Sequence, residues 1–133
     1  MTAKIIQPDG WLQPIGYANG ISATGRIIAV AGQIGWDPRT GTMVAADFAE
    51  QTAQALRNVV EVLKGAGARP ENIVRMTWYI TNRAAYMAAR RDIGLMYREI
   101  MGSHYTAMSV VVVHGLMEQD ADIEIEATAV IPE

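Results

Sequence analysis

The sequence predicts one α+β domain over residues 1–133, with the element order ββαβαββ. Three observations lead to this prediction. A length of 133 residues fits a single domain. A hydrophobic fraction of 50% with a charged fraction of 19% is typical of a globular chain and not of a disordered one. Segments with the two-residue period of strands are separated by two longer segments with the period of helices.

The first part of the chain is expected to form a β-hairpin followed by a loop. Strands at Ala18–Ser22 and Arg26–Ala31 flank Thr24-Gly25, where glycine permits the positive φ of a tight reversal. Residues 33–44 contain a proline and two glycines, which interrupt regular structure. We therefore expect a surface loop there.

The residues after Asp47 have the pattern of an amphipathic helix. Asp47 followed by Glu50 resembles a capping box with Asp in place of Ser or Thr. Gly65 or Gly67 should end the helix, because glycine suits the conformation that commonly follows a helix. The side chains that recur at helical spacing on one face are Phe48, Thr52, Leu56, Val59 and Leu63.

A strand and a second helix are predicted in the middle of the chain. Over Ile73–Thr81, apolar residues alternate with polar or amphipathic ones, which is the period of a strand. The second helix should begin near Asn82 and stop at Gly102. Its apolar face is expected to consist of Tyr86, Ala89, Ile93, Met96, Tyr97 and Ile100, with Arg90, Arg91, Arg98 and Glu99 on the outer side.

Two more strands are expected at Ala107–Val113 and Asp122–Ile131, joined by a turn over residues 115–121. In the last strand, Glu124 and Glu126 point to the same side, because side chains two positions apart share a face. Carboxylates in an apolar strand are costly to bury and often belong to an acid–base or polar network. Alternatively, this strand lies at an edge and both carboxylates simply face water.

The predicted sheet has an apolar face that its helices would leave uncovered. Residues 27–30 and 110–113 are apolar at every position, as in strands that are buried on both sides. Two helices on one face of the sheet cannot cover the other face, and soluble monomers rarely expose so large an apolar surface. The pattern therefore predicts a homo-oligomer.

Composition and motifs disfavour several function classes. A net charge of −3 with only two lysines argues against a nucleic-acid partner. The chain has no cysteine, and His104 and His114 lack acidic neighbours at ligand spacing, so a metal site is not expected. Nucleophile-elbow and phosphate-binding glycine patterns are absent from the sequence. No apolar run approaches the roughly 20 residues that span a bilayer, so we expect a cytoplasmic protein without membrane contact.

Five segments in consistent order and spacing form a recognisable set. They are Pro14-Ile15-Gly16-Tyr17, Val30-Ala31-Gly32-Gln33-Ile34, Asp37-Pro38 with Thr40-Gly41, Glu50-Gln51-Thr52 through Asn58-Val59, and Asp122 to Ala127. As a set they resemble the Rid family (reactive intermediate deaminases, also called YjgF-like), whose members have been labelled endoribonuclease L-PSP or translation initiation inhibitor. The resemblance covers nearly the whole chain.

The resemblance implies a chorismate-mutase-like fold and a homotrimer with a small-molecule cleft between each pair of subunits. It implies hydrolysis of enamine or imine products of pyridoxal-phosphate enzymes, with no cofactor of its own. Glu124 would then position or activate water, and Tyr17 of the other subunit would help to close the cleft. The backbone of Ala31-Gly32 would line the cleft.

The substrate-binding segment departs from the family pattern. The family's Pro-Ala-Arg-Ser or Pro-Ala-Arg-Thr reads Thr106-Ala107-Met108-Ser109 here, so that Met108 stands where an arginine would hold the substrate carboxylate. Such a charge-assisted pair contributes about 1.5–3 kcal/mol, which a thioether cannot replace. Met108 and Ser109 are still expected to contact substrate, but the usual 2-imino acids should bind poorly.

A second departure lies in the second helix, which is longer than the family's by one turn, or about four residues. Arg90, Arg91 and Asp92 fall within this window, and the cleft asparagine of the family cannot be placed there. An arginine from the window could partly replace the missing cation. Alternatively, the three residues form a solvated patch.

Three functions follow from these observations. The first is hydrolysis or tautomerisation of a reactive enamine or imine that lacks an α-carboxylate at its reacting end, with Glu124 as general base. The second is a non-catalytic trimer that binds a small molecule and has lost catalysis with the arginine. Ribonuclease or translation-inhibitor activity has the least support, because phosphate contacts require clustered positive charge.

Overall fold

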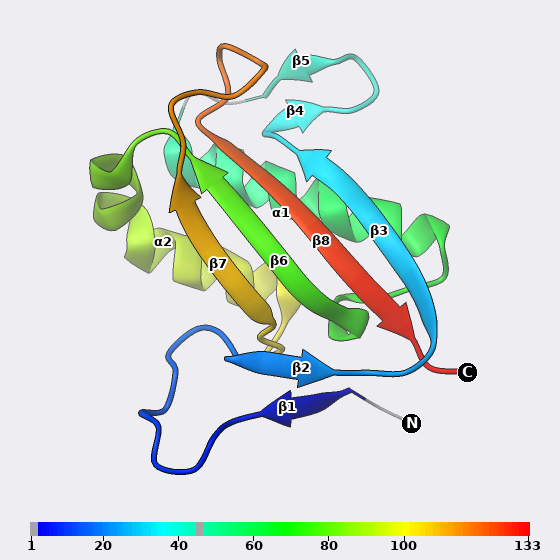
Figure 1. The fold of residues 1–133 in the computed structure, drawn as a ribbon. Helices are drawn as coiled ribbons and strands as arrows, with labels where there is room; N and C mark the ends of the chain where they lie inside the picture. Colours follow the sequence, from blue (N-terminus) through cyan, green and yellow to red (C-terminus); the bar gives the residue numbers. More distant parts are fainter. Residues whose placement is uncertain (1–2, 45–46) are drawn as a thin grey trace.

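A computed structural model describes residues 3–44 and 47–133 and confirms the α+β class. Its main sheet has four strands, with both helices on one of its faces (Figure 1). The strand order is β3-β8-β6-β7, in which only β6 and β7 run parallel. The strands span Arg26–Gln33 (β3), Ile73–Ile80 (β6), Ala107–Val112 (β7) and Ile123–Ile131 (β8).

Both predicted helices form and begin at the expected caps. α1 spans Phe48–Gly65, and the Asp47 carboxylate accepts hydrogen bonds from the backbone N–H groups of residues 49 and 50 at 2.8 and 3.3 Å. α2 spans Arg83–Met101, and the Asn82 side chain accepts from the N–H of residue 85 at 2.9 Å. These bonds satisfy N–H groups that have no partner inside the helix.

The core lies between the helices and the sheet. β8 contributes Ile123, Ile125, Ala127 and Ala129 from alternate positions, all buried, as its two-residue period predicted. α1 contributes the predicted Leu56, Val59 and Leu63, which are fully buried, and the six predicted residues of α2 either belong to this core or pack against it. The predicted helix faces are thus confirmed.

The predicted first hairpin is wrong. β2 (Gly20–Ser22) pairs with β1 (Lys4–Ile6), a strand that the sequence did not predict, while β3 pairs with β8. Gly25 is needed for a different reason than a tight turn. A side chain at Gly25, whose φ is 149°, would collide with the backbone of Ile131 at the end of β8.

The last two strands are also arranged differently from the prediction. β7 and β8 are not joined as neighbours but lie on the two sides of β6. β8 is therefore an interior strand, so the edge-strand explanation for Glu124 and Glu126 is wrong.

The predicted loop at residues 33–44 contains a short hairpin, formed by β4 (Trp36–Asp37) and β5 (Thr42–Met43). A single turn of 3-10 helix, Pro70–Asn72, precedes β6.

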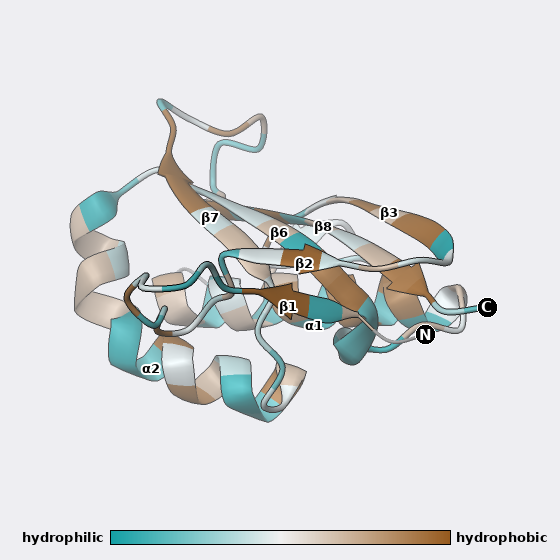
Figure 2. Cartoon of the chain, turned by 60° about the horizontal axis from the view of Figure 1, so that its bottom comes forward, coloured by the Kyte–Doolittle hydropathy of each residue, from teal (hydrophilic) through white to brown (hydrophobic). Residues whose placement is uncertain are grey.

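The second face of the main sheet carries no helix in the part of the chain that the structure describes (Figure 2). We call it the open face. Ile27 of β3 is 71% exposed there, and Val111 of β7 is 38% exposed. The prediction that the two helices leave one face of the sheet uncovered is confirmed for the single chain, but this face is apolar only in part, because β6 and β8 place Thr77, Glu124 and Glu126 on it.

Candidate functional site

The strand register places the predicted site residues on opposite faces of the sheet. Glu124 of β8 pairs with Tyr79 of β6, on the open face. Met108 of β7 pairs with Met76 of β6, which is fully buried beneath the helices. Within one chain, the Glu124 carboxylate and the Met108 thioether are therefore separated by the thickness of the sheet.

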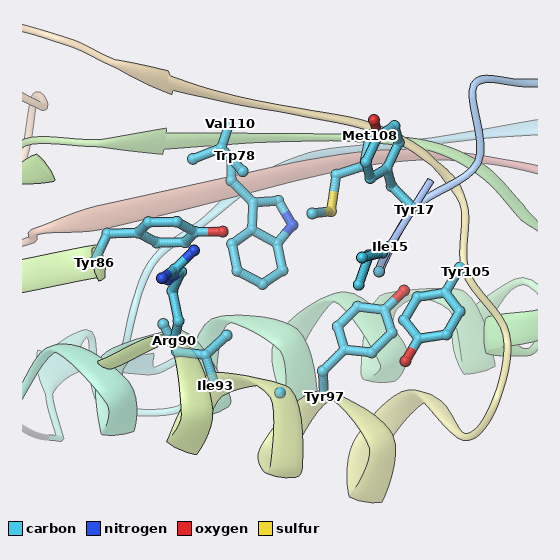
Figure 3. Close-up of a pocket in the computed structure, with 12 residues that line it drawn as sticks. Ile15, Tyr17, Trp78, Tyr86, Arg90, Ile93, Tyr97, Tyr105, Met108 and Val110 are labelled. Carbon is cyan, nitrogen blue, oxygen red and sulfur yellow. The ribbon is translucent and has the colours of Figure 1, made fainter. Parts of the chain in front are cut away.

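A pocket of about 550 Å³ lies on the helix side, between β6, β7 and α2 (Figure 3). Tyr17, from the segment that precedes β2, lies beside Met108 on one side of the pocket. Arg90 projects from α2 on the other side. Apolar and aromatic side chains form most of the remaining wall, namely Trp78, Tyr86, Ile93, Tyr97, Tyr105 and Val110.

Helical spacing brings the α2 residues to the pocket. Tyr86, Arg90, Ile93 and Tyr97 lie three or four positions apart and therefore share one face of the helix. The spacing in the sequence predicted this face for the three apolar members. The prediction that Arg90 lies on the outer side of this helix is wrong, because its position four residues after Tyr86 and three before Ile93 brings it to the pocket.

Arg90, Arg91 and Asp92 are all exposed, and of these three Arg90 alone lines the pocket. Figure 3 shows the Arg90 side chain projecting from α2 on the side of the pocket where Tyr86 lies. It forms no ion pair or hydrogen bond with any residue that the structure describes. The exposure of all three residues fits the predicted solvated patch, while the place of Arg90 at the pocket keeps open the alternative that this arginine supplies a cation to a ligand.

Two further polar groups belong to the pocket wall. Trp78 is only 1% exposed, and its indole N–H has no hydrogen-bond partner among the described residues. The Tyr97 hydroxyl donates to the backbone carbonyl of His104 at 3.1 Å. Burial raises the pKa of Tyr97 well above its ordinary range, so its phenol is neutral at physiological pH. No described Asp or Glu lines the pocket, so its one charged side chain is a cation.

The open face holds the predicted catalytic carboxylate. Gly32 lies directly beside Glu124, so that a β-carbon at position 32 would overlap the Glu124 side chain. On the same face the Tyr79 hydroxyl donates to the Glu126 carboxylate at 2.6 Å. This hydrogen bond raises the pKa of Tyr79, because it is lost when the phenol ionises. Glu126 therefore has a partner within the chain, whereas the structure gives Glu124 none among the described residues.

The other two predicted substrate-binding residues also lie away from the pocket. Ala31 is exposed, at the irregularity between Val30 and Gln33 where the pairing of β3 with β8 shifts. Ser109 is exposed opposite Thr77 on the open face. The predicted site is thus divided, with Tyr17 and Met108 in the pocket and the remaining residues on the other side of the sheet.

Two aromatic residues of the pocket were not predicted from the sequence. Trp78 falls in the apolar phase of β6, a pattern that indicates core and gives no sign that the ring borders a cavity. Tyr105 follows α2 and stacks on Tyr97, with ring centroids 5.5 Å apart and planes 2° from parallel. No local pattern around Tyr105 signals this contact.

The described residues contain no group of three or more side chains suited to hold a metal ion. The His104 ring donates from Nε2 to the carbonyl of Ile73 at 2.9 Å, which anchors the end of α2 to the sheet. Over residues 3–44 and 47–133, neither helix has the length and apolar character needed to cross a membrane.

The family model described as Endoribonuclease L-PSP matches residues 12–131. A RutC family protein from Pyrococcus horikoshii is 35% identical over 127 residues, which cover 95% of this chain and 96% of that protein. The human 2-iminobutanoate/2-iminopropanoate deaminase is 33% identical over 105 residues, or 79% of this chain and 73% of that protein. The crystal structure of YyfB from Yersinia pestis, a Rid family protein of unknown function, superposes with a TM-score of 0.87 at 32% identity and covers 98% of this chain and 100% of that one. The chain therefore belongs to the Endoribonuclease L-PSP family of Rid/YjgF-like proteins.

Proposed function

We propose that this protein is a Rid-type enzyme that hydrolyses a small reactive enamine or imine in clefts between copies of the chain. The observation that carries the proposal is the division of the predicted site between the two faces of the sheet. One wall of the cleft would be the pocket with Tyr17 and Met108. The other would be the open face of a second copy, with Gly32 and Glu124.

A homotrimer with three equivalent clefts is the assembly that we propose. Ile27 is 71% exposed on the open face, and burial of such apolar area favours association. The same association would give each pocket a carboxylate from a neighbouring chain. In a cyclic arrangement of three copies, each pocket would face the open face of a neighbouring copy, and all three interfaces would be identical.

The proposed reaction is hydrolytic deamination. An enamine substrate first tautomerises to the imine, and Glu124 then accepts a proton from water as the water oxygen adds to the imine carbon. The resulting carbinolamine loses ammonia and leaves a carbonyl group, so one water is consumed and one ammonia is released. No electrons are exchanged with an external group, so the reaction requires no redox cofactor.

The substrate of this enzyme is expected to differ from the compounds in the human relative's name. 2-Iminobutanoate and 2-iminopropanoate are 2-imino acids with only four and three carbon atoms. Met108 presents a thioether to the pocket and cannot form the charge-assisted hydrogen bonds that an arginine would give their carboxylate. We expect these small acids to bind poorly beside β7. We place the activity in the cytoplasm, where pyridoxal-phosphate enzymes release such short-lived intermediates.

A non-catalytic trimer that binds a small molecule is the second candidate, and Met108 is also the observation that favours it. Ribonuclease activity, which the family description names, has little support from this chain. Its net charge is −3 and it has two lysines, whereas binding of a phosphate backbone depends on clustered positive charge.

Release of ammonia from a panel of freshly generated imines tests the enzyme. The Glu124→Gln variant should be slower by about 100-fold or more, because it removes the general base. Glu126→Gln is the matched control, since Glu126 lies on the same strand and face but bonds to Tyr79. Equal rates for the parent protein and Glu124→Gln would contradict the proposed enzymatic function and favour the non-catalytic trimer that binds a small molecule.

Sedimentation of the purified protein at micromolar concentration tests the assembly. A mass of about three times 14.5 kDa is expected. A stable monomer would contradict the proposed cleft, because Tyr17 and Glu124 lie on opposite faces of one chain and could not meet.

A further inference from the structure

We infer that the pocket beside α2 selects 2-imino acids, and the 2-oxo acids formed from them, that carry an aromatic or large branched side chain, with Arg90 binding the carboxylate. The inference rests on the proposed function for the reaction, but binding can be measured without turnover. Met108 of β7 cannot bind the α-carboxylate of such a substrate. Arg90 of α2 also lines the pocket and can supply the cation that binds this carboxylate. Three features of the pocket support it.

The first feature is the unpaired guanidinium. Arg90 is exposed, lines the pocket from α2 (Figure 3) and has no acidic partner among the described residues. Asp92 and Glu99, the acidic residues of α2, are exposed outside the pocket lining. A planar guanidinium in this state is suited to bind a carboxylate through two parallel hydrogen bonds.

The second feature is the aromatic wall beyond Arg90. The Trp78 and Tyr97 rings have centroids 6.4 Å apart, and Tyr105 stacks on the far side of Tyr97. Ile93 and Val110 complete the apolar lining. In a volume of about 550 Å³, a substrate of three or four carbons would leave most of this wall in contact with water. An aryl or branched side chain would bury the wall, with the ring geometry that aromatic pairs favour.

The third feature is a buried donor that has no hydrogen-bond partner among the described residues. The Trp78 indole nitrogen points toward the Met108 side chain, within the set of residues that line the pocket (Figure 3). An unsatisfied buried N–H is unfavourable, and nearly all such groups in folded proteins have a partner. Met108 is unbranched and has three rotatable bonds, so it can move aside for a ligand oxygen. Arg90 and Trp78 together therefore offer donors to the carboxylate and carbonyl of a 2-oxo acid.

Calorimetric titration of the full-length protein tests the inference with three stable probes. Phenylpyruvate has the carboxylate and the aromatic ring, pyruvate lacks the ring, and phenylacetone lacks the carboxylate. Phenylpyruvate should bind at least about 10-fold more tightly than either of the others, because each lacks one of the two contacts.

The Arg90→Gln variant tests the anion contact. It should weaken phenylpyruvate binding by about 10-fold to 100-fold, since a charge-assisted pair is lost, and should leave phenylacetone binding unchanged. Arg91→Gln is the matched control, because it removes the same charge from the adjacent, exposed position of α2. The Arg90→Lys variant should recover part of the affinity, because it keeps the charge without the planar fork.

Three results would overturn the inference: no binding of phenylpyruvate, pyruvate binding as tight as phenylpyruvate binding, or equal effects of Arg90→Gln and Arg91→Gln. These outcomes are separable from failure of the proposed function. Phenylpyruvate binding that depends on Arg90, combined with ammonia release that is absent or unaffected by Glu124→Gln, would support the ligand class and contradict the proposed enzyme. Ammonia release that depends on Glu124 and occurs only with small imines would support the enzyme and contradict the ligand class.

Discussion

Replacing Gly32 with alanine should displace the Glu124 carboxylate without disrupting the fold. A β-carbon at position 32 would lie 2.6 Å from Cδ and 2.8 Å from Cγ of Glu124, and the three atoms nearest to it all belong to that side chain. Ordinary contact begins at 3.4 Å, so the carboxyl carbon must retreat by roughly 0.8 Å. Rotation about the side-chain bonds of Glu124 can provide this shift without any movement of the backbone.

The Gly32→Ala variant should therefore lose activity far more than stability. Gly32 does not have a positive φ, so alanine fits its backbone conformation. An off-rotamer Glu124 would cost about 0.5–1.5 kcal/mol. The lower entropy of the unfolded variant offsets about 0.4–1 kcal/mol of this cost. The free energy of unfolding should change by less than about 1 kcal/mol, whereas misplacement of a catalytic group by about 1 Å can slow a reaction about 100-fold.

Ammonia release and urea unfolding, measured on the same preparations, test this expectation. Gly115→Ala is the silent control, since a β-carbon there meets no atom within 4 Å. Gly35→Ala is the opposite control, since a β-carbon there would lie 2.6 Å from the Cα of Gln51 in α1 and should destabilise the fold. Full activity of Gly32→Ala alongside an inactive Glu124→Gln variant would refute the reasoning. So would a loss of stability as large as that of Gly35→Ala.

Two further predictions concern stability. Asp47→Ala should lower the free energy of unfolding by about 1 kcal/mol, because it leaves the N–H groups at the start of α1 without their cap; an unchanged urea midpoint would contradict this. Tyr97→Phe should reduce the loss of stability at high pH. The folded-state pKa of Tyr97 is raised by burial, so the stability it contributes is fully present below the unfolded pKa of about 10 and is lost as the pH rises above that value. Melting temperatures that fall in parallel for the parent protein and Tyr97→Phe above about pH 10 would show that another group is responsible.

The helices and most of the residues that they bury could be predicted from local sequence patterns. The second helix was expected from near Asn82 to Gly102, and α2 spans Arg83–Met101. Caps and glycine stops act through hydrogen bonds and dihedral angles within a few residues, so they can be read locally. The spacing of apolar residues likewise determined which side of each helix meets the sheet, because helical geometry is the same in any fold.

The pairing of the strands could not be predicted from local patterns, because it depends on contacts between distant segments. Alternation along β8 showed which side chains share a face, but not that the strand lies between β3 and β6. The predicted hairpin is wrong for the same reason, because β2 pairs with β1 near the N-terminus and not with β3. Hydrogen bonds between strands join any two extended segments that packing brings together, so neighbours in sequence need not be neighbours in a sheet.

The candidate site shows the same limit. The sequence supplied Tyr17, Met108 and Glu124 as candidates, but Arg90 was expected on the outer side of its helix and lines the pocket instead. That Met108 and Glu124 face opposite sides of the sheet depends on the register of β7 and β8 against β6, which is set by contacts between distant segments. A shift of one residue in either register would reverse the face of every side chain in that strand, and only the packed core decides between the two.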